Sequence, residues 1–98
     1  MIKATMIRMK TNCYNSNILE EIKDIKIEGD ISNPGWFSKE IVHDFIKNQN
    51  ATVKVNIYPY PVLVPVKTST DKYVRSTPNK YGYDNLLELP RDNNMGLF

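Results

Sequence analysis

A chain of 98 residues suits a single domain, because two domains would each fall below the roughly 70–80 residues at which a core stabilises itself. Apolar residues make up 41% and charged residues 24% of the chain, which excludes a disordered or collagen-like protein. The net charge of +2, from 13 basic and 11 acidic side chains, is too small for a protein dedicated to binding duplex nucleic acid.

The first predicted element is a strand over residues 4–10. Apolar and polar side chains alternate there, which is the pattern of a half-buried strand. This alternation places Thr5, Ile7 and Met9 together on one face. We therefore expect these three side chains to point in the same direction.

A short helical turn and a second strand are predicted next. Asn17 precedes Glu20 by three residues, in the manner of a capping box, so we expect a helical turn near residues 18–22. Isoleucines then alternate with charged side chains, which predicts a strand that ends at about Glu28.

The central predicted element is a helix over residues 39–48. It follows a turn-rich segment, residues 29–35, and Ser38 is a good N-cap. The apolar face of this helix comprises Ile41, Val42, Phe45 and Ile46, while Lys39, Asp44 and Lys47 are expected to face water. Trp36 is expected to anchor the helix onto the sheet.

Three further strands are predicted at residues 52–57, 62–67 and 72–77. The middle one is expected at a sheet edge, because the prolines at 59, 61 and 65 remove backbone donors. Asp84 or Asn85 caps a short helical turn through Leu89. The expected fold is α+β, with a mostly antiparallel sheet of four to five strands packed on one main helix, a domain over residues 1–91 and a tail over 92–98.

Residue types that build enzyme and metal sites are sparse. Cys13 has no second cysteine for a disulfide, and together with the single histidine, His43, it falls short of the ligands of a metal site. His43 is expected to be a partly exposed helix residue. Four glycines are too few for a phosphate-binding loop. We therefore predict no enzyme activity, no cofactor and no metal.

Nothing in the sequence predicts membrane association. Charge interrupts the first eight residues too early for a signal peptide, and no run approaches the roughly 18 apolar residues of a membrane span. A cytoplasmic protein is the expectation. The abundance of Ile, Lys and Asn is typical of an AT-rich bacterium or one of its phages.

Tyrosines and basic residues concentrate in the last part of the chain. A tyrosine ring and an arginine fork together bind bases and phosphates, whereas tyrosine also suits a half-buried strand position without any ligand. The candidate ligand-binding residues are Tyr60, Lys72, Tyr73, Arg75, Tyr81 and Tyr83.

Three motifs of this chain resemble a family of small bacterial and phage proteins catalogued as domain of unknown function 3892. They are Trp36-Phe37-Ser38, Lys72-Tyr73-Val74-Arg75-Ser76 and Asp84-Asn85-Leu86-Leu87-Glu88-Leu89-Pro90. The resemblance covers about residues 22–91 and implies a compact α+β module. The family has no established activity, so the resemblance identifies no catalytic residue in this chain.

The favoured function is a non-enzymatic binding module of bacterial or phage origin. We expect it to be a phage or mobile-element protein that captures a small nucleotide-like ligand or blocks a host protein. One alternative is binding of single-stranded nucleic acid, with Lys54, Lys72 and Arg75 neutralising phosphates. Another is a structural protein that forms a homo-oligomer through its proline-rich edge, residues 58–66.

Overall fold

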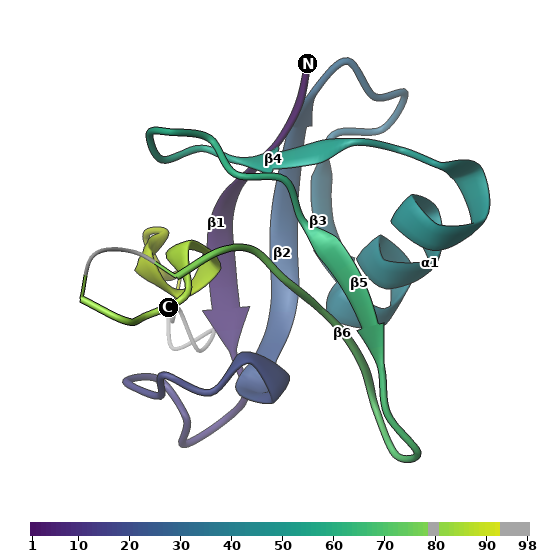
Figure 1. Cartoon of the computed structure of the whole chain (residues 1–98). Coiled ribbons are helices and arrows are strands. Elements are labelled where there is room, and N and C mark those ends of the chain that lie inside the picture. The colour runs from purple at the N-terminus through teal and green to yellow at the C-terminus, as the bar shows by residue number, and fades with distance from the viewer. Residues whose placement is uncertain (79–80, 93–98) are drawn as a thin grey trace, which may run out of the picture.

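The computed structural model confirms the α+β fold and describes residues 1–78 and 81–92 (Figure 1). One sheet has four strands in the order β3-β2-β1-β4, and a second has the two strands β5 and β6. The elements are β1 (Ile2–Met9), η1 (Leu19–Glu21), β2 (Ile22–Gly29), β3 (Gly35–Ser38), α1 (Lys39–Gln49), β4 (Val53–Val55), β5 (Val64–Lys67), β6 (Lys72–Arg75) and η2 (Asn85–Glu88), where η denotes a 3-10 turn.

β1 carries a bulge that changes which of its side chains are buried. Ala4 pairs with Ile27 and Met6 with Lys26, so Thr5 has no partner in the antiparallel ladder. An extra residue in one strand reverses the alternation of the side chains beyond it. Ala4 and Ile7 are therefore both buried, and the prediction that Thr5 shares a face with Ile7 and Met9 is wrong for Thr5.

η1 and β2 lie where the sequence predicts them, but the turn is not capped as expected. The residue before η1 is Ile18, whose side chain provides no cap, so the predicted capping box of Asn17 and Glu20 is absent. The Ser16 hydroxyl instead accepts a 3.0 Å hydrogen bond from the Ile18 backbone nitrogen and donates to the Glu21 carboxylate.

β3 is a strand that the sequence does not predict, because glycine and proline dominate the segment before it. It pairs with β2, where Phe37 lies opposite Ile25 and Trp36 lies opposite Lys26. Phe37 therefore packs against the core, and Trp36 lies on the other face of the sheet. There the Arg8 guanidinium stands 4.0 Å from the centre of the Trp36 ring, so Trp36 does not anchor the helix as expected.

α1 begins and ends as predicted, but its buried face is rotated. The Ser38 hydroxyl caps it by accepting a 3.2 Å hydrogen bond from Ile41 N, and Asn50 ends it in a left-handed conformation. Ile41 is 55% exposed, whereas Lys39 and His43 are each only 2% exposed. The predictions of a solvent-facing Lys39 and a partly exposed His43 are thus wrong, because β5 and β6 pack on that side of the helix.

The proline-rich segment forms a bend between the two sheets. β4 runs parallel to β1, and after the bend the chain returns along β4: Val55 N donates to Pro61 O and Leu63 N donates to Val53 O, both at 2.8 Å. β5 and β6 then form an antiparallel hairpin that lies across α1 (Figure 1). The predicted single sheet is thereby divided into two.

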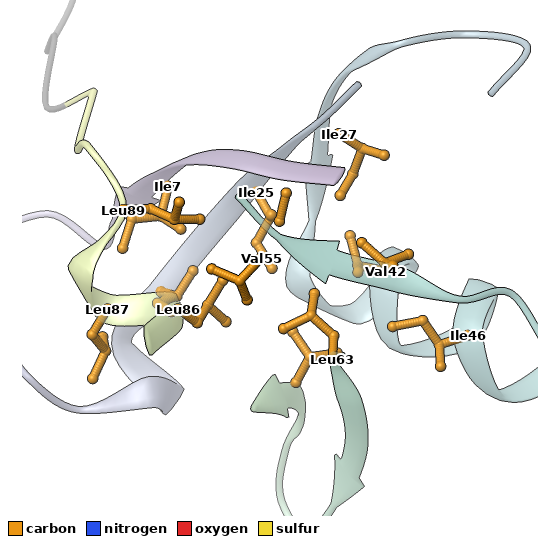
Figure 2. Close-up of a cluster of buried hydrophobic side chains, with 14 of the residues drawn as sticks. Ile7, Ile25, Ile27, Val42, Ile46, Val55, Leu63, Leu86, Leu87 and Leu89 are labelled. Carbon is orange, nitrogen blue, oxygen red and sulfur yellow. The ribbon is translucent and has the colours of Figure 1, made fainter. Parts of the chain in front are cut away.

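The C-terminal segment closes one end of the core. Leu86, Leu87 and Leu89 are buried and lie at the end of the hydrophobic cluster away from Val42 and Ile46 (Figure 2). Beyond η2 the chain lies along β1, where Ile7 N donates to Pro90 O at 3.0 Å and Asp92 N donates to Ile7 O at 2.9 Å. The contacts with β1 reach Asp92, the first residue of the predicted tail; the rest of that tail lies outside the described residues.

Candidate functional site

Lys72, one of the predicted ligand-binding residues, is engaged in an ion pair. Its ammonium lies 2.9 Å from a carboxylate oxygen of Asp44, which α1 carries. The pair connects the start of β6 to the helix. A ligand phosphate would therefore have to compete with Asp44 for this cation.

Tyr73 and Arg75 alternate with the buried residue Val74 along β6. Tyr73 is half-buried opposite Val66, and Arg75 is exposed opposite Val64. The Arg75 guanidinium makes a long hydrogen bond, 3.5 Å, to the carbonyl of Ser76. Arg75 is therefore a surface cation on the two-stranded sheet, at the other end of β6 from Lys72.

An open groove lies between the proline-rich bend and the segment around η2. Its volume is about 700 Å³, within the range of small-molecule and peptide sites. We call it the tyrosine groove; its lining residues are Ile57, Tyr58, Pro59, Thr77, Pro78, Tyr81, Asn85 and Glu88.

Two tyrosines project from the walls of the tyrosine groove into solvent. Tyr58 is 82% exposed and Tyr81 is 73% exposed. The Tyr58 ring also meets the Tyr60 ring edge to face, with ring centres 6.0 Å apart. Of the predicted residues, Tyr81 therefore lines the groove, and Tyr60 lies beside it in contact with Tyr58. Tyr58 lines the groove although it was not among the predicted residues. Tyr83 is exposed but is not a lining residue.

Asp84 and Asn85 fix the wall of the groove that η2 provides. Asp84 caps η2 by accepting a 2.9 Å hydrogen bond from Leu86 N, and it also accepts from the backbone nitrogen and the hydroxyl of Ser76, at 3.0 and 2.6 Å. The Asn85 amide donates to Thr77 O at 2.9 Å. The Asp84–Pro90 motif therefore has a structural role next to the groove.

A second group of polar side chains, which was not predicted from the sequence, connects α1 with η1 and β6. The buried Lys39 ammonium donates to Glu20 O at 2.5 Å and to the Asp71 carboxylate at 2.9 Å. His43 Nδ1 lies 2.9 Å from the Asp44 carboxylate. The available signal was spacing: Lys39 and His43, four residues apart, lie on the flank of the helix next to Val42 and Ile46.

The carboxylates of this group are held in their charged form. The hydrogen bond from Lys39 lowers the pKa of Asp71, against desolvation that raises it. The hydrogen bond from Lys72, followed by the one with His43, lowers the pKa of Asp44. Lys39 and His43 are enclosed, and their partners Asp71 and Asp44 lie at the edge of the group, so these ion pairs join α1 to the hairpin.

Cys13 lies beside a hollow in the loop after β1, and its thiol is deactivated. Desolvation is the main cause that raises the pKa of Cys13, and its hydrogen bond with Glu21 raises it further. The thiolate is the reactive form of cysteine, so a raised pKa is opposite to what a nucleophile needs.

Alkylation of Cys13 by iodoacetamide at pH 7.5 is therefore expected to be slower than that of an unstructured cysteine peptide. The Glu21→Gln variant should react faster than wild type, because the loss of the Glu21 charge removes one of the causes that raise the pKa of Cys13. Glu20→Gln, at the neighbouring position, is the matched control. A Glu21→Gln rate equal to that of wild type would show that Glu21 does not control the thiol.

The described residues offer few other sites. Within residues 1–78 and 81–92, no group of three or more His, Cys, Asp or Glu side chains could hold a metal ion. In the same part of the chain, no helix is long and apolar enough to cross a membrane.

Comparison with known proteins identified one family. The model of the family described as "Protein of unknown function (DUF3892)" matches residues 3–90, which includes β1 and the proline-rich bend as well as the three motifs. No curated protein and no solved structure matches the chain.

Proposed function

This chain belongs to the DUF3892 family, and because the family description assigns no activity, we propose from the structure that it is a non-enzymatic binding module. Its tyrosine groove binds a segment of another protein. The proposal retains the expectation of a phage or mobile-element protein that blocks a host protein. In this proposal, the tyrosine groove is the surface that contacts the host protein.

The exposure of Tyr58 and Tyr81 in one groove is the observation that carries the proposal. A protein with enough apolar residues for a core does not need two mostly exposed rings in order to bury apolar area. Tyrosine is enriched at protein interfaces, because its ring supplies contact area and its hydroxyl a hydrogen bond. Of the nine large apolar residues described as exposed, six lie between residues 58 and 83.

The backbone at the bend supports a surface shaped for contact. Tyr60 has a φ of +62°, in the left-handed region that a bulky residue rarely occupies. Such conformations persist only where the surroundings enforce them, and they are common at binding sites. The Tyr60 ring contacts the Tyr58 ring edge to face and so restricts the orientation of Tyr58. The ring is therefore partly preorganised, which reduces the entropy lost on binding.

The electrostatics of the groove favour a protein segment over a nucleotide. Glu88 is the charged side chain among the described lining residues, and a carboxylate repels phosphate. The predicted cation Lys72 is paired with Asp44 on a different surface. The same pairing weakens the alternative of single-stranded nucleic-acid binding, which relied on Lys72 to neutralise phosphate.

The proposal is tested by selecting a random peptide library on the immobilised protein. We expect peptides that bind the wild-type protein but do not bind the Tyr58→Ser, Tyr81→Ser double variant. Both rings are exposed, so these substitutions should leave the fold intact, as circular dichroism would verify. Ile41→Ser, at a 55% exposed apolar position on α1, is the control and should bind like wild type.

Two results would contradict the proposal. One is a set of selected peptides that bind the double variant as well as wild type. The other is an empty selection together with heat released on titration of nucleotides or cyclic nucleotides into the wild-type protein, which would restore the nucleotide-like ligand.

A further inference from the structure

Glu88 gives the tyrosine groove a negative charge that the described part of the protein does not neutralise. Its side chain is exposed at the edge of η2 and forms no hydrogen bond or ion pair with the described residues. Three other acidic side chains form ion pairs with side chains of the protein: Asp71 with Lys39, Asp44 with Lys72 and Asp92 with Arg8. An unpaired carboxylate next to an apolar groove favours a ligand that brings a cation.

The groove walls combine aromatic and proline rings. Tyr58 and Pro59 come from the bend, while Pro78 and Tyr81 come from the segment that leads to η2. Aromatic-lined grooves of this kind bind proline-rich segments, whose polyproline II helix is already formed before binding and so loses little entropy.

Hydroxyl groups in the groove suit the same class of ligand. A polyproline II backbone makes no internal hydrogen bonds, so its carbonyl groups need donors from the protein. Tyr58 and Thr77 bring hydroxyl donors to the lining. Its side chains thus match both the apolar rings and the exposed carbonyls of such a segment.

From these observations we infer that the partner segment is an extended, proline-rich stretch with a basic residue that pairs with Glu88. This inference rests on the proposed function and adds the chemistry of the ligand to it. A second copy of the chain, which also contains a proline-rich segment, is an alternative occupant that the experiment must separate.

The probe is a labelled twelve-residue peptide of alternating proline and alanine with one central arginine, followed by fluorescence anisotropy. A matched peptide carries glutamate in place of arginine. We expect the arginine peptide to bind more tightly, although the net charge of +2 would favour the acidic one. Glu88→Lys should weaken binding of the arginine peptide about fivefold, the effect of reversing one exposed charge.

Glu40→Lys is the control, because it changes the net charge by the same amount on α1 and should shift the affinity by less than about twofold. Equal affinities for the two peptides, with binding still lost in the Tyr58→Ser, Tyr81→Ser variant, would overturn the inference and leave the proposed function standing. Peptide binding that survives the loss of both tyrosines would overturn both. A dimer in light scattering that the Tyr58→Ser, Tyr81→Ser variant no longer forms, together with no binding of the arginine peptide by the wild-type protein, would assign the groove to a second copy and overturn the inference alone.

Discussion

The Asp71→Asn variant is expected to unfold with a free energy about 3 kcal/mol smaller than that of the wild-type protein. Asp71 is the counter-ion of Lys39, whose side chain is almost fully buried. Removing one member of a buried pair leaves the other charge without compensation in a poorly solvated place. Urea denaturation followed by circular dichroism measures the difference.

Lys39→Met provides the matched comparison. Methionine is similar in length and carries no charge, while Asp71, at the end of the hairpin, remains partly in contact with water. This variant should lose only about 1 kcal/mol, because apolar replacement of a buried ion often costs little. The account predicts that adding Lys39→Met to Asp71→Asn recovers most of the lost stability. A cost of Asp71→Asn below that of Lys39→Met would contradict it.

The same pair makes stability depend on pH in the acid range. Because the folded-state pKa of Asp71 lies below its ordinary value, about 3.9, this residue stabilises the fold fully above that value. The contribution is lost as the pH falls through the lower, folded-state pKa. Asp71→Asn should therefore flatten the dependence of unfolding free energy on pH below about 4, leaving the parts that Asp44 and Asp30 contribute.

Asp84→Ala is expected to have an effect of similar size, about 3 kcal/mol. The substitution removes the cap of η2 and leaves the backbone nitrogen of Ser76, a residue only 2% exposed, without its acceptor. The Ser76 hydroxyl loses its 2.6 Å hydrogen bond to Asp84 and retains only the 3.3 Å bond to Thr77 O. Buried donors without acceptors are costly, and bonds to a charged acceptor are stronger than neutral ones. Thermal and urea denaturation both report the loss.

Asp84→Asn and Ser76→Ala serve as graded controls. Asparagine keeps an acceptor oxygen and a capping side chain, and Ser76→Ala removes only the hydroxyl, so each should cost about 1 kcal/mol. If Asp84→Ala left stability unchanged but altered peptide binding, the Asp84–Pro90 motif would belong to the binding surface and its structural role would be refuted.

Elements that depend on local signals could be predicted from the sequence. α1 follows from Ser38 and the apolar spacing behind it, and η2 follows from Asp84 and Pro90. Both signals act within a few residues. The bulge at Thr5 could not be predicted, because it depends on how β1 pairs with β2, some twenty residues later in the chain.

The candidate site was predicted in part for the same reason. The concentration of tyrosines located the region, but burial and pairing are decided by contacts between distant segments. Lys72 was assigned to a ligand because nothing in the sequence links it to Asp44, which lies 28 positions earlier. Lys39 was predicted to be exposed because charged side chains are usually at the surface. A charged side chain can be buried when another segment of the chain supplies its counter-ion, as Asp71 does for Lys39.

The central claim, that the tyrosine groove is the binding surface, is tested most directly by mapping amide chemical shifts with nitrogen-15 NMR while a selected peptide is added. The account predicts shifts that concentrate at Tyr58, Thr77, Tyr81 and Glu88, with little change at Lys67 and Ser69 in the hairpin turn. Shifts that concentrate at the hairpin turn, or around Trp36 on the outer face of the sheet, would contradict it.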